Sequence, residues 1–190
     1  MVILIFPKSL NRMNKFFGIF SLCVFFLSCS SDLDFNQVND VKLEPVLVSN
    51  LASFDVQANQ FVIGGVEQPV SGDLMNFDIF KQSFLNQNLN RADFYFEFTN
   101  TINRGFKINL ILLDASNTPL YTIPFDVPAY TAGQPPVTKT EIFQNAQLNL
   151  LKNTSKIAFM VTLMPGPALS QSSLGSLKLR SSATLYFVME

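Results

Sequence analysis

Residues 92–100 read ADFYFEFTN, and residues 104–114 read RGFKINLILLD. Apolar side chains occupy every second position of both stretches: Phe94, Phe96 and Phe98 in one, and Phe106, Ile108, Leu110 and Leu112 in the other. A period of two is typical of β-strands that bury one face. The linking residues TNTINRG include turn formers, so the sequence predicts two strands joined as a hairpin.

A third strand is predicted at LYTIPFDV (residues 120–127), after the turn DASNTP (residues 114–119). Together the three consecutive strands are expected to form an antiparallel meander. Pro124 has no backbone N–H to donate, so the third strand is expected at the edge of its sheet.

The period changes in TKTEIFQNAQLNLLKN, residues 138–153. Thr138 and Glu141 have the spacing of a capping box, and the apolar residues that follow recur at helical spacing. Asn153 suits the left-handed position that often follows a helix. The sequence therefore predicts one amphipathic helix near residues 139–152, with its apolar stripe packed on the core.

Further strands are predicted where residues alternate or where short apolar runs lie between turn formers. They lie near residues 44–49, 51–57, 60–64, 156–163 and 175–190. The last run is unusually long, so we expect a β-bulge around Ser181 and Ser182.

About eight strands, one helix and no βαβ alternation predict an all-β, mainly antiparallel sandwich of immunoglobulin-like or transthyretin-like topology. A lipocalin-type or other closed barrel is the alternative. Of the 20 phenylalanines, 14 follow Cys29 and can fill the inner faces of two sheets. Both cysteines, Cys23 and Cys29, precede the predicted strands, and removal of residues 1–28 as a signal would leave only Cys29, so the core must be held by packing.

Catalytic chemistry finds little support in the sequence. The chain has no histidine, which removes the commonest general base and most zinc and copper sites. Ser181 and Ser182 lie near Lys178, a coincidence that is common on exposed strands. There is no Gly-x-Ser-x-Gly elbow and no glycine-rich phosphate loop. We therefore expect no enzyme activity and no cofactor.

Two pairs of carboxylates could in principle serve as the acid and base of a glycosidase, Asp93 with Glu97 and Asp73 with Asp78. Asp93 and Glu97 share the strand face opposite the phenylalanines, so solvent exposure explains them. Asp73, Asn76 and Asp78 could hold calcium, but the sequence lacks the Asp-x-Asp-x-Asp-Gly pattern, and no metal site is predicted.

Two loops are candidate interaction surfaces, VPAYTAGQPPV (residues 127–137) and MPGPALSQSSLGS (residues 164–176). Loops on a rigid sandwich commonly carry binding, and proline lowers the cost of ordering them. The residues singled out are Tyr130, Pro135, Pro136, Pro165 and Pro167. The alternative is that both segments are plain connectors.

The N-terminal residues have the features of a secretory signal. In MNKFFGIFSLCVFFLS (residues 13–28), Lys15 precedes an apolar run of about a dozen residues, too short for a membrane span of about 20. The sequence predicts a cleaved signal over residues 1–28.

The junction Phe26-Leu27-Ser28-Cys29 resembles the lipobox of bacterial lipoproteins, although Phe26 and Leu27 stand where smaller or aliphatic residues are usual. Ser31, Asp32 and Asp34 directly behind it resemble the acidic surface-export tag of Bacteroidota lipoproteins.

The resemblance implies that Cys29 is acylated and becomes the first mature residue. Residues 29–43 would then form a flexible tether and residues 44–190 a single domain. It also implies an outer-membrane protein exposed at the cell surface, or alternatively on the periplasmic face.

Three of the 13 basic residues, Lys8, Arg12 and Lys15, precede Cys29, which leaves ten against 14 acidic residues. Without a basic run, nucleic acid is not an expected partner. The expected function is a non-catalytic, lipid-anchored protein that binds or scaffolds an envelope protein or glycan. The alternative is a carrier or sensor of a small apolar or glycan ligand, held between the sheet and the helix at residues 143–151.

Overall fold

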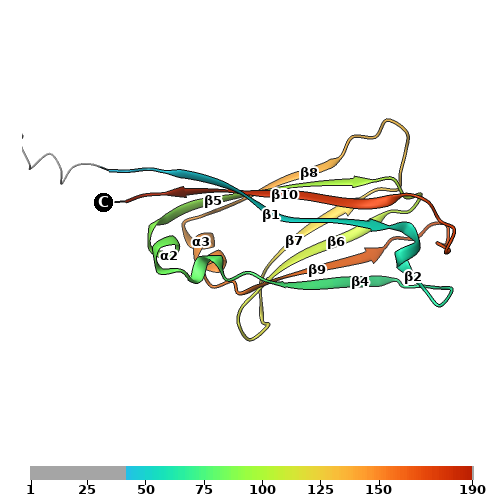
Figure 1. Cartoon of the computed structure of the whole chain (residues 1–190), viewed down its shortest axis with the longest axis horizontal. Coiled ribbons are helices and arrows are strands. Elements are labelled where there is room, and N and C mark those ends of the chain that lie inside the picture. The colour runs from blue at the N-terminus through green and yellow to red at the C-terminus, as the bar shows by residue number, and fades with distance from the viewer. Residues whose placement is uncertain (1–41, 190) are drawn as a thin grey trace, which may run out of the picture. The chain divides into compact units, whose positions relative to one another are not determined.

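Two four-stranded antiparallel sheets lie face to face in the computed structural model, which describes residues 42–189 (Figure 1). One sheet has the strand order β1-β10-β5-β8 and the other β4-β9-β6-β7. Their bounds are Val46–Gln57 (β1), Val70–Asn76 (β4), Leu89–Asn100 (β5), Phe106–Leu113 (β6), Pro119–Val127 (β7), Val137–Gln144 (β8), Lys156–Leu163 (β9) and Ser176–Phe187 (β10). The predicted all-β sandwich is confirmed.

The connectivity is that of a jelly roll. Along these eight strands, the chain crosses from one sheet to the other at every connection except that between β6 and β7. Among these eight strands, β6 and β7 are the one consecutive pair that lies side by side in a sheet. This order is the double-sheet jelly roll rather than the immunoglobulin-like or transthyretin-like topology that we expected.

The predicted hairpin of residues 92–100 and 104–114 is wrong, because β5 and β6 belong to different sheets. Alternation identifies the face that a strand buries but not the strand beside it. The apolar faces of β5 and β6 meet across the core from opposite sheets. The second half of the meander, β6 with β7, does form, and β7 is an edge strand as Pro124 predicted.

The helix predicted near residues 139–152 is correct only in its second half. Residues up to Gln144 form β8, and the helix α3 spans Ala146–Lys152. Thr138 and Glu141 make no capping box, because they lie on β8 opposite Glu97 and Phe94 of β5. Pairing with β5 therefore outweighs the local helical pattern. Asn153 is right-handed, with φ −86°, rather than left-handed.

The strands predicted at residues 44–49 and 51–57 are one continuous strand, β1. The strand predicted at residues 60–64 is instead a 3-10 turn, Ala58–Phe61, followed by the short strands β2 (Val62–Ile63) and β3 (Val66–Glu67). Strand β4 and the short helix α2 (Ser83–Asn88) were not predicted.

The β-bulge expected around Ser181 and Ser182 lies opposite these residues, on β1 instead of β10. Asn50 pairs with Ser182 and Ser53 with Arg180, so Leu51 and Ala52 together face Ser181. The Ser181 hydroxyl accepts a hydrogen bond from Ala52 N at 2.9 Å and donates one to Ala52 O at 2.7 Å. Strand β10 itself keeps an unbroken register with β5 at this point. Ser181 thus holds the bulge of β1.

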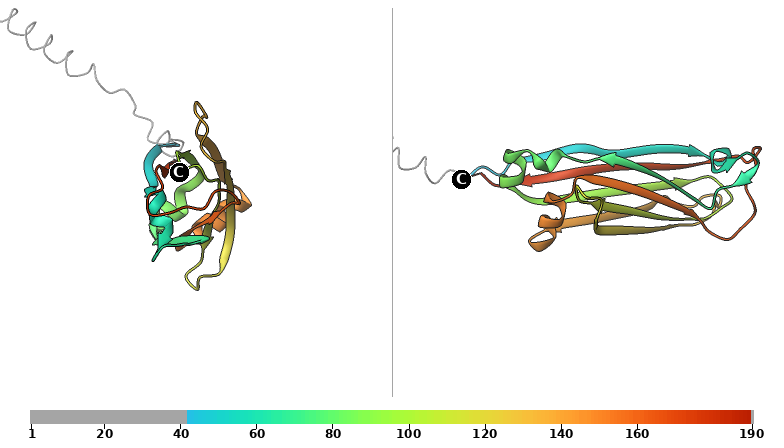
Figure 2. Two further views of the ribbon diagram at one scale, coloured as in Figure 1. Left: turned by 90° about the vertical axis from the view of Figure 1, so that its right-hand side faces the viewer. Right: turned by 90° about the horizontal axis from the view of Figure 1, so that it is seen from below.

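The sandwich has two different ends, visible in Figure 1 and in the side view of Figure 2. The terminal end carries Lys42 and Met189 with the helices α2 and α3. The loop end carries four of the segments that cross between the sheets, residues 58–69, 101–105, 128–136 and 164–175. Residues from Lys42 on form a compact unit whose buried core lies within it, so this unit is expected to fold by itself.

Candidate functional site

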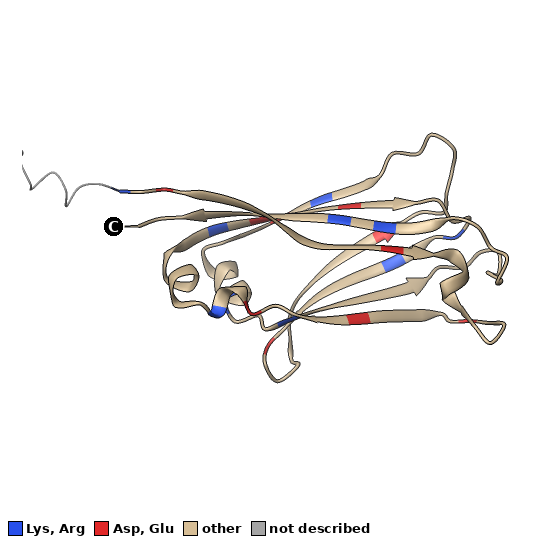
Figure 3. Cartoon of the chain, in the orientation of Figure 1, with Lys and Arg blue, Asp and Glu red and all other residues tan. Residues whose placement is uncertain are grey.

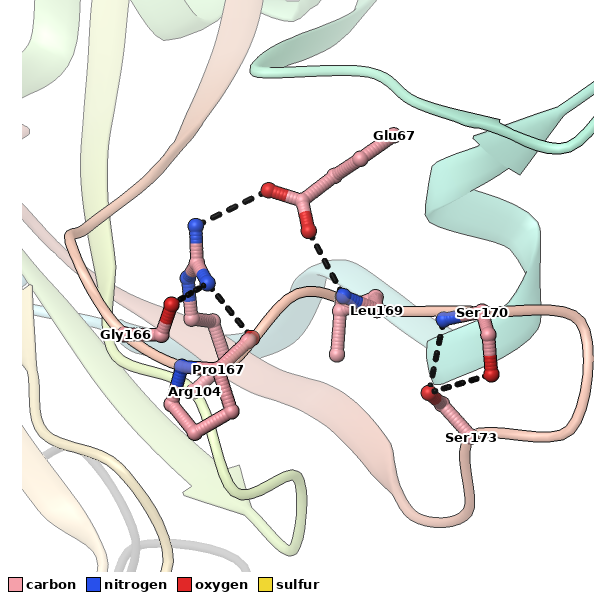
Figure 4. A network of polar contacts seen from close by, with 7 residues as sticks. All are labelled: Glu67, Arg104, Gly166, Pro167, Leu169, Ser170 and Ser173. Atoms are coloured by element: carbon pink, nitrogen blue, oxygen red, sulfur yellow. Dashed lines mark hydrogen bonds and ion pairs between the residues drawn. The ribbon is translucent and has the colours of Figure 1, made fainter.

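Two regions are candidates for function, the loop end and a groove between the edge strands β1 and β4. At the loop end, Arg104 lies among the crossing segments, with its side chain only 9% exposed. It donates from Nη2 to Glu67 Oε1 at 2.8 Å and from Nη1 to the carbonyls of Gly166 and Pro167 (Figure 4). Glu67 Oε2 accepts a further hydrogen bond from Leu169 N at 2.6 Å.

These contacts fix the loop of residues 164–175 against two other segments of the loop end. A buried guanidinium is tolerated only where oxygen acceptors are near, and here a carboxylate and two carbonyls accept from Nη2 and Nη1, while the buried Nε has no hydrogen-bond partner among the described residues. Gln171 adds a hydrogen bond to Val62 O at 2.6 Å. The loop is therefore held by side chains rather than by regular pairing. No local pattern in the sequence predicts the Glu67–Arg104 pair, because the two residues are far apart in the chain and lie in different loops.

The loop of residues 128–136 is fixed by Asn100, which is 8% exposed. Its amide donates to Arg104 O at 2.8 Å and to Pro128 O at 2.7 Å, and its Oδ1 accepts from Ile102 N at 2.9 Å. Beyond this anchor, Tyr130 is 48% exposed, while its backbone N–H donates to Ile102 O. The ring of Tyr130 is thus presented by a fixed backbone.

The prolines singled out in the sequence all lie at the loop end and are exposed. They belong to two separate loops, Pro135 and Pro136 to one and Pro165 and Pro167 to the other. Closure of the second loop requires a glycine, because Gly175 has φ +98° and an added Cβ would lie 2.3 Å from Thr101 O.

The second region, the β1–β4 groove, is the space between the edge strands β1 and β4 on one side of the sandwich. It comprises two hollows of about 260 and 320 Å³, both of which Met75 lines. The apolar residues of the first hollow are Ala52, Phe54, Val56, Phe61, Met75, Phe159 and Val161. The second extends beside Phe77, Phe80 and Leu185 towards the terminal end.

The opposite side of the sandwich, between the edge strands β7 and β8, is closed by side chains. Tyr121 of β7 donates its hydroxyl hydrogen bond to Glu141 of β8 at 2.6 Å, and its ring packs on Phe143. This hydrogen bond, and secondarily burial, raises the pKa of Tyr121 above its usual 10.0. Lys139 lies over the ring of Phe125, 5.5 Å from the ring centre.

The carboxylates of Asp93 and Glu97 are engaged by near neighbours in the sequence. Asp93 accepts two hydrogen bonds from Arg91, at 2.7 and 2.8 Å, which raise the pKa of Arg91. Glu97 accepts a hydrogen bond from Tyr95 at 3.3 Å. Partial desolvation, with Glu97 nearby, raises the pKa of Tyr95. Both carboxylates lie on the outer face of the sheet, as the alternation predicted.

The other candidates do not come together as a reactive group. Ser181 bonds the β1 bulge, whereas Lys178 lies on the other face of β10 and pairs with Asp55 at 3.0 Å. Asp73 lies in the β1–β4 groove, while Asp78 pairs with Lys81 at 2.6 Å. Within residues 42–189, no three His, Cys, Asp or Glu side chains form a group that could hold a metal ion.

The helix stripe expected to line a ligand pocket is instead packed. Phe143, Leu148 and Leu151 are at most 7% exposed. The space for a ligand lies across the sandwich, in the β1–β4 groove. Cys29, Ser31, Asp32 and Asp34 lie outside the described residues. No helix in the described part of the chain is long and apolar enough to cross a membrane.

No protein-family model matches the sequence, and a search of curated proteins found no match. Among solved structures, the chain is similar to VP2 of infectious bursal disease virus (TM-score 0.42, 12% identity, 75% of this chain and 33% of that chain). It is also similar to a candidate secreted protein of Parabacteroides distasonis (TM-score 0.40, 19% identity, 61% of this chain and 37% of that chain). The chain thus spans about a third of the length of these two proteins.

Proposed function

We propose that this chain is a non-catalytic, lipid-anchored envelope protein that binds or scaffolds another envelope component through its loop end. The observation that supports this proposal is the separation of the two ends of the sandwich. Leu43 and Met189 exchange backbone hydrogen bonds of 3.1 and 2.9 Å at the terminal end, whereas the fixed, exposed loops lie at the other end.

The anchor in this proposal is Cys29, with its sulfur carrying lipid. Residues 30–41 connect it to Lys42, where the sandwich begins. A membrane attachment would therefore act on the terminal end and leave the loop end outermost. The 12-residue strand β1 spans about 40 Å between the two ends. Ser31, Asp32 and Asp34 would act as the export tag that directs the protein to the cell surface.

The loop end suits recognition because its backbone is fixed before a partner arrives. Burial of Arg104 and Asn100 holds both loops, so binding would cost little additional ordering. Tyr130 offers an aromatic ring with a hydroxyl group, a side chain that suits contacts with either protein or glycan. Lys and Arg are interspersed with Asp and Glu along the strands rather than gathered (Figure 3), which favours such partners over nucleic acid.

Membrane fractionation of a Cys29→Ala variant tests the anchor. The wild-type chain is expected in the outer-membrane fraction, and the variant is expected in the soluble fraction. A variant that still sediments with membranes would overturn the lipoprotein proposal. Protease treatment of intact cells then distinguishes a surface-exposed domain, which is degraded, from one on the periplasmic face, which is protected.

Photo-crosslinking tests the loop end as the binding surface. A crosslinking amino acid at position 130 is expected to capture a reproducible envelope protein or glycan. The matched control places it at Ser116, which is exposed in the turn between β6 and β7 at the opposite end of the strands. Equal capture from both positions, or none from position 130, would contradict a loop-end interface.

A second candidate function is a carrier or sensor of a small ligand, and the β1–β4 groove favours it. In this function the ligand would lie between the edge strands β1 and β4, instead of between the sheet and the helix as the sequence predicted. The second hollow, of about 320 Å³, lies within the range of about 300–1,000 Å³ that small-molecule sites have, and the first, of about 260 Å³, adjoins it at Met75.

A further inference from the structure

Strand β4 carries its polar and apolar residues the wrong way round for an edge of a sandwich. In its register with β9, Ser71 pairs with Val161 and Asp73 with Phe159. Both partners on β9 are core residues. Ser71 and Asp73 therefore lie on the inner face of the sheet, because directly paired residues share a face. The apolar residues Val70 and Leu74 alternate with them and are 53% and 52% exposed.

Behind these polar residues the groove is apolar. Phe159 and Val161 of β9 form its floor, one strand in from the edge, and Phe54 of β1 forms part of the opposite wall. Phe54 packs on Phe159 with a ring-centre distance of 6.0 Å. A ligand in the groove would therefore meet hydrocarbon along its length and a carboxylate at the mouth.

The charged residues that line the groove are both acidic. Asp78, in the second hollow, is neutralised by Lys81. Asp73, in the first, accepts one hydrogen bond, from Leu74 N to Oδ1 at 2.8 Å, and has no ion-pair partner within residues 42–189. Its charge is thus available to a cation from outside the domain.

We propose that the β1–β4 groove binds a small amphipathic ligand that consists of an alkyl chain with a cationic head. The chain lies over Phe159, Val161 and Met75, and the head pairs with Asp73. The proposal deepens the carrier function and depends on neither the lipid anchor nor the loop end. An added peptide strand fits less well, because it would lie beside β4 in the plane of the sheet and would not reach the floor on β9.

The test uses residues 30–190, which contain the whole compact unit, and follows NMR chemical shifts on titration with decylammonium and decanoate. Decylammonium is expected to bind at least about threefold more tightly than decanoate and to shift the Met75 methyl signal. Asp73→Asn is expected to abolish this preference, since exposed ion pairs are worth up to about 1 kcal/mol, or about fivefold. The matched control, Asp126→Asn on the edge strand β7, is expected to keep it.

Two further arms locate the ligand and identify it. Ser71→Trp fills the mouth from an exposed position and is expected to weaken binding of both probes, while butylammonium is expected to bind far more weakly than decylammonium. Equal binding of the two ten-carbon probes, or a preference unchanged in Asp73→Asn, would overturn the proposal. A third result would also overturn it. If an acetylated Val-Lys-Val-Lys-Val peptide amide binds and shifts the backbone signals of β4, while decylammonium does not bind, the groove accepts an added strand instead.

Discussion

The two sides of the sandwich, where edge strands face each other, are built in opposite ways. Between β7 and β8, Tyr121 reaches across to Glu141 and covers Phe143. Between β1 and β4, the inner face of β4 offers Ser71 and Asp73, and a groove remains. The sheets are closed where long side chains bridge them and open where short polar ones replace them. Four predictions test this difference.

The largest difference in the free energy of unfolding is expected when a phenylalanine on each side is replaced by alanine. Phe143→Ala removes a ring that is 1% exposed beside the closed side, and it should lower the free energy of unfolding by about 3–5 kcal/mol. Phe54→Ala removes a partly buried ring that already borders a hollow, so about 1–2 kcal/mol is expected. Denaturant unfolding measures both. Equal losses would show that the groove side is as tightly packed as the closed side.

Ser181→Ala tests how firmly the bulge of β1 is held at the edge of the groove. The substitution leaves Ala52 N and Ala52 O without their hydroxyl partner, and a loss of about 1–2 kcal/mol in unfolding free energy is expected. Ser182→Ala is the control, since Ser182 faces away from the core on the same strand. If both variants lose the same stability, the hydroxyl of Ser181 has no special role.

Tyr121→Phe removes the hydrogen bond that closes the β7–β8 side and is expected to cost about 0.5–1.5 kcal/mol at neutral pH. Because folding raises the pKa of Tyr121, its contribution is complete below about pH 10 and is lost as the pH rises above that value. Between pH 8 and pH 11, the free energy of unfolding should therefore fall more steeply for the wild type than for the variant. Parallel curves would contradict this role.

Ser71→Val is expected to have the smallest effect, an increase of up to about 0.5 kcal/mol in unfolding free energy. Valine favours strands and would cover part of the apolar floor of the groove. Thr122→Val, at an exposed position of the edge strand β7, is the matched control. A clear loss of stability at position 71 would show that the polar inner face of β4 stabilises the fold.

Alternation in the sequence was sufficient to predict most strands and the solvent-facing side of Asp93 and Glu97. It failed at β4, because VSGDLMN directs its polar residues towards the core and its apolar residues outwards. It also failed at β8, where residues 137–144 have both strand and helix features. Pairing with the neighbouring strand β5 makes this segment a strand. The groove and the Arg104 contacts depend on which strands and loops become neighbours, and no local pattern encodes that.

The pairing of Leu43 with Met189 has a mechanical consequence. Strand β1 runs from this pair to the loop end, antiparallel to β10 along nearly its whole length. A pull on Lys42 against a load at the loop end would slide β1 along β10, so the hydrogen bonds between them would share the force instead of breaking one after another. Attachment through this corner would make the sandwich resist tension along its long axis, the direction in which a tethered partner pulls.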